Sequence, residues 1–244
     1  MTTLLVAHGA LGSAAQMQPL VDALTARGKG LWHVRPFEFP GHGASPLADA
    51  ERFSLPAFAD ALHDAVRALD DAPFLLGYSM GGYVGLAVEA RSPGTFRGIL
   101  TLGTKFEWTP ALAEREASRL DPAVIATKVP RFAEALAARH AQADGWEAVL
   151  LRTAHLLRQN AASPLLTVDL LERIATPVCV AVGSADDTVS ADESRAAAAM
   201  MLRARCEVLD GVPHPIERVP PALLVDLAWS LFQPHRPATS NTTN

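Results

Sequence analysis

The feature that most limits the fold is an apolar strand that runs into a serine between glycines and then into a helix. The apolar run Phe74 to Leu76 is followed by Gly77-Tyr78-Ser79-Met80-Gly81, and apolar residues then recur at helical spacing. Glycines two residues on either side of Ser79 remove side chains that would clash in a sharp turn. The stretch therefore predicts a nucleophile elbow, which raises the Ser79 hydroxyl above a strand end and over a helix N-terminus.

This pentapeptide also occurs in ordinary glycine-rich turns, so its meaning depends on the rest of the chain. Short apolar strands alternate with amphipathic helices on both sides of it. Strands are expected at residues 4–7, 32–37, 74–76, 98–102, 178–182 and 205–209, and helices at 14–26, 55–69, 165–174, 192–201 and 221–232. This alternation predicts a mostly parallel α/β sheet flanked by helices, with its sites at the carboxyl ends of the strands.

The connection from residue 103 to residue 176 is several times longer than a single crossover needs. It is rich in Ala, Leu, Arg and Glu, and prolines at positions 110, 122, 130 and 164 divide it. We expect a small helical cap at 104–162, inserted before the last two core strands. The core then comprises residues 1–103 and 163–233, followed by a disordered tail at 234–244. A small separate domain packed elsewhere is the alternative.

Two loops after later strands supply the partners that a serine nucleophile needs. Asp186 and Asp187 follow one predicted strand, and His214 follows the next, between two prolines that keep its loop extended. We favour Asp186 because it lies three residues after Gly183, where the strand ends, whereas Asp187 suits a solvated or helix-capping position. The chain order serine, acid, histidine is that of the elbow fold, in which histidine is the base and the acid orients it.

Negative charge that develops on a carbonyl oxygen requires preorganised hydrogen-bond donors. In the elbow geometry one donor is the backbone amide after the nucleophile, Met80, and the other comes from the loop after the first strand, at Ala10. His8 and His42 lie in loops on the same rim, and we expect them to shape those loops rather than to transfer protons.

Composition excludes several other classes of protein. The net charge of −5 gives no electrostatic basis for binding nucleic acid or an anionic membrane. Cys179 and Cys206 are expected to be free thiols in buried strands, and no cysteine–histidine cluster has the spacing of a zinc site. No apolar run reaches about 18 residues, and no signal peptide precedes the first strand, which predicts a cytoplasmic protein.

Taken together, these motifs resemble those of the α/β-hydrolase-fold superfamily over nearly all of the predicted core. The motifs are His8-Gly9-Ala10-x-Gly12, Pro40-Gly41-His42-Gly43-x-Ser45, Gly77-Tyr78-Ser79-Met80-Gly81-Gly82, Gly183-x-x-Asp186 and Gly211-x-x-His214. The resemblance implies the compact esterase, C–C hydrolase and haloperoxidase-like branch, with a Ser-Asp-His triad and a helical cap. Epoxide hydrolases and haloalkane dehalogenases carry aspartate at the elbow, and the menaquinone-pathway lyase typically has arginine where this chain has Tyr83.

The leading hypothesis is a serine hydrolase that cleaves an ester or similar acyl bond in a small, largely apolar molecule without a cofactor or metal. Catalytic residues would be Ser79, His214 and Asp186. We expect the pocket to include Leu11, Tyr78, Phe106, Trp108 and His155, and the protein to be a monomer or small homo-oligomer. Alternatives are a ligand receptor that retains the triad but turns over slowly, and a cofactor-free C–C hydrolase, acyltransferase or lyase.

Overall fold

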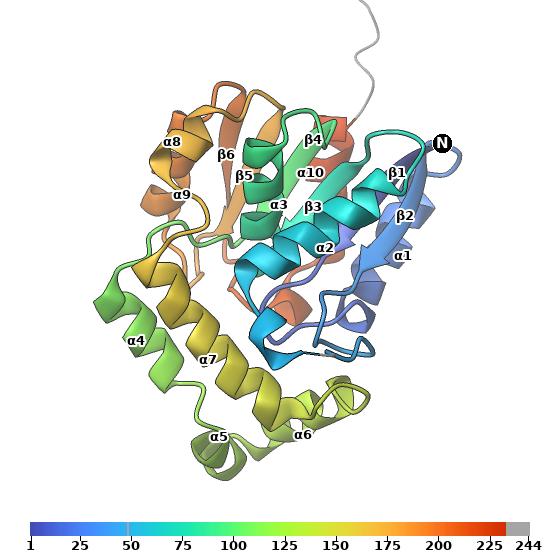
Figure 1. Cartoon of the computed structure of the whole chain (residues 1–244). Coiled ribbons are helices and arrows are strands. Elements are labelled where there is room, and N and C mark those ends of the chain that lie inside the picture. The colour runs from blue at the N-terminus through green and yellow to red at the C-terminus, as the bar shows by residue number, and fades with distance from the viewer. Residues whose placement is uncertain (48, 233–244) are drawn as a thin grey trace, which may run out of the picture.

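The fold is built on six parallel strands. The computed structural model describes residues 1–47 and 49–232, so the predicted tail at 234–244 lies outside the described residues. The strands are β1 (Thr2–Ala7), β2 (Trp32–Phe37), β3 (Phe74–Tyr78), β4 (Gly98–Leu102), β5 (Val178–Gly183) and β6 (Ala204–Leu209). Their order is β2-β1-β3-β4-β5-β6, and all neighbours run parallel (Figure 1), which confirms the predicted sheet. The order reverses between β1 and β3, and the crevice at such a switch point is where α/β sheets bind ligands.

Successive residues of each strand face opposite sides of the sheet, and both sides are apolar. Leu5 and Ala7 of β1 join one core cluster, whereas Leu4 and Val6 join the other. The second cluster is covered by α1 (Gln18–Arg27, preceded by the 3₁₀ turn Ala15–Met17) and α10 (Pro221–Phe232), and the first by α2 (Leu55–Arg67), α3 (Met80–Arg91), α8 (Val168–Glu172) and α9 (Ala191–Met200). Burial on both faces explains why the inner strands are largely apolar runs, whereas the edge strands β2 and β6 contain charged residues.

Four helices occupy the long connection between β4 and β5. They are α4 (Pro110–Ser118), α5 (Pro122–Lys128), α6 (Pro130–Arg139) and α7 (Trp146–Ala162), and Figure 1 shows them together at one end of the molecule. Proline at the first position costs no hydrogen bond, and the Thr109 and Asp121 side chains cap α4 and α5. The predicted boundaries 1–103, 104–162 and 163–233 stay predictions. Within the described residues, no helix is both long and apolar enough to cross a membrane.

The helix predicted at 165–174 is wrong at its start. The observed helix α8 begins only at Val168, and the chain before it is irregular. The amide of Leu165 donates to Asn160 Oδ1 at 3.0 Å, and the amide of Leu166 donates to the Tyr83 hydroxyl at 3.1 Å. These tertiary hydrogen bonds satisfy the amides that a first helical turn would leave free, so the chain does not need to coil there.

The expectation that both cysteines lie in buried strands also needs correction. Cys179 is fully buried in β5, but Cys206 is only half-buried because β6 is an edge strand. Both cysteines are free thiols.

Candidate active site

Ser79 occupies a strained turn between β3 and α3. Its backbone has φ of 50° and ψ of −114°, a conformation that residues other than glycine rarely adopt. The turn is tight enough that a Cβ atom on Gly81 would lie 2.6 Å from the carbonyl oxygen of Ala7. The Ser79 amide donates to Leu102 O at 2.8 Å, and the Thr104 hydroxyl donates to Ser79 O at 3.1 Å. Surrounding contacts therefore hold the strained peptide in place.

The structure brings Asp186 and His214 together. Asp186 Oδ2 lies 2.8 Å from His214 Nδ1, and the aspartate side chain is only 2% exposed. Its other oxygen, Oδ1, accepts from the amides of Thr188 at 2.8 Å and Val189 at 2.9 Å. Burial opposes the charged form, but the hydrogen bonds from His214 and the two amides outweigh it and lower the pKa of Asp186. The neighbouring Asp187 is exposed, whereas Asp186 contacts His214, so the geometry favours Asp186 over Asp187 as the acid that orients the histidine.

The backbone of His214 is tied to the elbow strand. The Tyr78 hydroxyl donates to His214 O at 3.0 Å, and the two rings lie 5.5 Å apart. Burial, followed by the nearby charges of Glu217 and Asp186, raises the pKa of Tyr78, so its hydroxyl stays protonated and able to donate. Ser79 and His214 line the same cavity, but a hydrogen bond between their side chains is absent from the described residues. Such bonds commonly tighten only in a substrate complex.

The two backbone amides expected to bind an oxyanion, those of Ala10 and Met80, are free donors. Neither has a hydrogen-bond acceptor within residues 1–47 and 49–232, and both residues line the cavity. The loop that contains Ala10 approaches the elbow closely, because a Cβ atom on Gly9 would lie 2.8 Å from the Tyr78 ring. The next residue, Leu11, has φ of 59°. Ala10 and Met80, whose backbone N–H groups are unpaired within the described residues, therefore line the same cavity as Ser79.

Three buried histidines connect this loop to its neighbours. His8, His42 and His140 are each fully buried. His8 Nε2 accepts from the Phe39 amide at 3.1 Å, and His140 Nδ1 accepts from the Gly43 amide at 3.0 Å. Burial is the largest cause that lowers the pKa of His42 and of His140, which keeps both rings neutral. These contacts agree with the loop-shaping role expected for His8 and His42. No group of metal-ligating side chains with a suitable arrangement occurs among the described residues.

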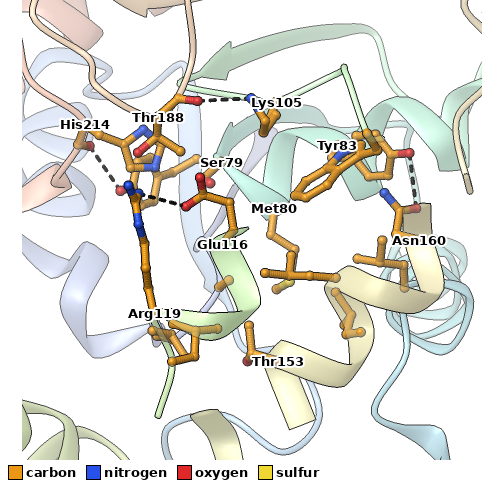
Figure 2. Close-up of a pocket in the computed structure, with 18 residues that line it drawn as sticks. Ser79, Met80, Tyr83, Lys105, Glu116, Arg119, Thr153, Asn160, Thr188 and His214 are labelled. Carbon is orange, nitrogen blue, oxygen red and sulfur yellow. Dashed lines mark hydrogen bonds and ion pairs between the residues drawn. The ribbon is translucent and has the colours of Figure 1, made fainter. Parts of the chain in front are cut away.

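A cavity of about 290 Å³ opens beside Ser79, a size that suits a small molecule (Figure 2). Three predicted lining residues do line it: Leu11, Tyr78 and Trp108. The other two, Phe106 and His155, do not. Phe106 packs against the main core while its amide donates to Glu193, and His155 is exposed on the outer side of α7.

The sequence predicts that residues of the inserted segment between Leu112 and Leu157 line the pocket, but it does not identify which of them do. Helix α7 contributes Thr153, Leu156, Leu157 and Asn160, α4 contributes Glu116, and Arg119 follows directly after α4. The four α7 positions follow the spacing i, i+3, i+4 and i+7, so they form one helical face. That periodicity was a usable signal, but the sequence alone does not say whether such a face meets a cavity or a core.

The charged lining residues are already paired with other side chains. Lys105 Nζ lies 3.3 Å from Glu193 and 3.1 Å from the carbonyl oxygen of Thr188. Arg119 donates to Glu116 at 3.1 Å. The cavity is therefore largely apolar, with a few satisfied charges at its walls.

The parallel sheet, the strained serine turn beside the switch point and the hydrogen-bonded Asp186–His214 pair in the loops after β5 and β6 define an α/β-hydrolase architecture. The chain belongs to the alpha/beta hydrolase family, whose family model matches residues 4–227.

Among curated proteins, the chain is 37% identical over 81 residues to a pimeloyl-acyl-carrier-protein methyl ester esterase of Neisseria meningitidis serogroup C. The match covers 33% of this chain and 29% of that protein, so the shared segment spans less than a third of the relative's length.

Solved structures share the fold over most of the chain. A thermophilic esterase from Thermogutta terrifontis has a TM-score of 0.72 at 19% identity, covering 94% of this chain and 89% of its own. A haloalkane dehalogenase from Bradyrhizobium elkani USDA94 has the same TM-score at 18% identity, with coverage of 94% and 89%. At these identities the likeness concerns the fold alone, since one architecture supports different reactions.

Proposed function

We propose that this hydrolase cleaves an ester, or a similar acyl bond, of a small and largely apolar molecule by a serine mechanism. The observation that carries the proposal is the contact between Asp186 and His214, whose side-chain atoms Oδ2 and Nδ1 lie 2.8 Å apart. His214 and Ser79, the residue at the elbow, line the same cavity. The partial match to a methyl ester esterase supports ester cleavage. Helices α4 and α7 would act as the cap that encloses the substrate.

Each group has a role that its position supports. His214 would take the proton from the Ser79 hydroxyl as the serine oxygen attacks the ester carbonyl, and Asp186 would stabilise the resulting imidazolium. The amides of Ala10 and Met80 would donate to the carbonyl oxygen as it becomes negative. The imidazolium then protonates the departing alcohol. Water, deprotonated by His214, cleaves the acyl-enzyme and releases the acid, so the cycle consumes one water and requires no cofactor.

Hydrolysis of p-nitrophenyl esters over a chain-length series tests the proposal. In Ser79→Ala and in His214→Ala we expect kcat/KM to fall by about a thousandfold or more, because each change removes a group that acts as part of a unit. His155→Ala, on the exposed side of α7, is the matched control and should behave as wild type. Wild-type activity no greater than that of Ser79→Ala would refute the esterase proposal and favour a binding protein. The cytoplasmic location expected from the sequence stays a prediction.

A further inference from the structure

The residues that line the cavity carry an unusual share of the buried polar atoms without partners. Seven buried side-chain polar atoms lack a hydrogen bond within the described residues, and three of them belong to residues that line this one cavity. They are Trp108 Nε1, Thr153 Oγ1 and Asn160 Nδ2. Buried polar groups in folded proteins are normally paired, so a cluster of exceptions in a binding cavity calls for an explanation.

The orientation of the Asn160 amide is fixed by its neighbours. Asn160 is 4% exposed, and its Oδ1 atom accepts from the amide of Leu165 at 3.0 Å and from the Tyr83 hydroxyl at 3.3 Å. The Tyr83 hydroxyl in turn accepts from the amide of Leu166 at 3.1 Å. Because a backbone N–H can donate only to the amide oxygen, the nitrogen of Asn160 must take the other position. Figure 2 shows the hydrogen bond between that oxygen and the Tyr83 hydroxyl as a dashed line.

The unpaired groups indicate which chemical groups of a ligand could pair with them. The side-chain nitrogens of Asn160 and Trp108 can only donate, so each requires an acceptor. The charged lining groups do not supply one within the described residues: Lys105 and Arg119 are cations that only donate, and Glu116 is hydrogen-bonded to Arg115 and Arg119 rather than to either nitrogen. Leu156 and Leu157 separate Thr153 from Asn160 on the same face of α7, so the polar ends of this face flank an apolar middle.

We propose that the substrate carries a second acceptor oxygen, remote from the carbonyl that Ser79 attacks, and that Asn160 Nδ2 binds it. The substrate class would be esters of oxygenated acyl chains, such as oxo-acyl or carboxylate-ended esters, rather than plain aliphatic esters. Trp108 Nε1 supplies a second donor in the same cavity. This inference rests on the proposed esterase function, because it names the substrate of the same site.

A positional scan of the acyl chain tests the inference directly. The probes are p-nitrophenyl hexanoate and heptanoate, their 4-, 5- and 6-oxo derivatives, and a carboxylate-ended ester of the same length. Rates are corrected for spontaneous hydrolysis. We expect kcat/KM for one oxygen position to exceed that of the plain ester by about tenfold or more, the worth of a good hydrogen bond to a buried donor. Equal kcat/KM values at every position would overturn the proposal, and the carboxylate arm shows whether the acceptor is neutral or anionic.

The variant Asn160→Asp tests whether Asn160 causes the preference for an oxo-ester over the plain ester. The variant keeps an oxygen for the Leu165 amide and the Tyr83 hydroxyl but replaces the donor by a second acceptor. Assayed at pH 8, where a carboxyl group is ordinarily ionised, it should reduce the ratio between the best oxo-ester and the plain ester to about one. Gln159→Glu makes the same chemical change on the exposed side of α7 and should keep the wild-type ratio. An unchanged ratio in Asn160→Asp would refute the assignment.

Two further measurements keep the proposal testable if Asn160→Asp does not fold or if the protein hydrolyses no ester. Trp108→Phe removes the indole N–H and keeps an aromatic ring, so a reduced ratio there supports the donor argument even if Asn160→Asp does not fold. Binding to Ser79→Ala, followed as the rise in unfolding temperature with ligand, separates the two proposals. If wild-type protein hydrolyses no ester, the function proposal fails. Stronger stabilisation of Ser79→Ala by the oxo-ester than by the plain ester would then still support the subsite, and equal stabilisation would refute it.

Discussion

Replacing Asp186 with asparagine tests whether this residue sets the proton position on His214. Asp186 Oδ1 accepts from the amides of Thr188 and Val189 at 2.8 and 2.9 Å, and those amides need an oxygen. In Asp186→Asn the single oxygen must therefore stay on that side, and the new NH₂ group must face His214 Nδ1, which lies 2.8 Å from Oδ2 in the native protein. An NH₂ group donates, so Nδ1 has to accept and the ring proton moves to Nε2.

A His214 ring protonated at Nε2 cannot take the proton of Ser79. The same exchange of tautomer in a known Ser-His-Asp triad lowers kcat by about 10⁴, with the geometry intact. That factor corresponds to about 5.5 kcal/mol of lost transition-state stabilisation. We expect a loss of this order for Asp186→Asn in kcat on p-nitrophenyl butyrate, with circular dichroism to confirm that the variant is folded.

Asp187→Asn is the matched control, because it makes the same change in the exposed adjacent residue. Its activity should stay within about twofold of wild type, as for most exposed substitutions. If Asp186→Asn retained more than about a tenth of the wild-type kcat, the tautomer argument would be refuted. If Asp187→Asn lost as much activity as Asp186→Asn, the choice between the two acids would be wrong.

The close contact under the elbow and the buried histidines give two predictions about stability. A Cβ atom at Gly81 would lie 2.6 Å from Ala7 O, so Gly81→Ala should lower the free energy of unfolding in urea by about 3 kcal/mol. Gly98→Ala, whose Cβ would meet neighbours at 3.4 Å, should change it by less than about 1 kcal/mol. Burial lowers the pKa of His42 in the folded protein below the ordinary value of 6.5. As the pH falls, His42 of the unfolded chain therefore binds a proton before His42 of the folded protein does. The contribution of neutral His42 to the free energy of unfolding is therefore fully present above pH 6.5. Below pH 6.5 this free energy should decrease by up to about 1.4 kcal/mol per pH unit because of this residue. Urea titrations at pH 7.5 and 5.5 should show a smaller loss in His42→Phe than in wild type or in the exposed control His33→Phe, and an equal loss would contradict the assignment.

The sheet and the elbow could be predicted from the sequence because their signals are local. A buried parallel strand is a continuous apolar run, and the glycines around Ser79 are demanded by contacts that any such turn makes. The chain order of Ser79, Asp186 and His214 also suffices to place their loops on one rim, because parallel strands bring their carboxyl ends to the same edge. The structure brings Asp186 and His214 into contact, and the catalytic roles of all three stay predictions until the variants are assayed.

The features that sequence reasoning missed depend on contacts between distant segments. A serine–proline pair at 163–164 is a sound helix start locally, yet the side chains of Tyr83 and Asn160 capture the next two amides and delay the helix to Val168. Strand order is only partly of this kind: the charged residues Arg205 and Glu207 on either side of Cys206 are typical of an edge strand, but the segment does not reveal which strand it pairs with. His155 and Asn160 both lie on α7, and only packing decides which of the two residues lines the cavity.

Helix α6, which packs on the cavity-lining helix α7, supports the loop of the proposed oxyanion site. The carbonyl oxygen of Leu11 accepts from Arg139 at 2.9 Å and from His140 at 3.1 Å, both at the end of α6. These bonds hold Leu11 at its φ of 59°, next to the Ala10 amide. A shift of α6 would therefore move a donor that must meet charge in the transition state, and not only the walls that contact the substrate. Since α6 packs on α7, exchange of residues 104–162 for the corresponding segment of another family member should lower kcat as well as alter KM.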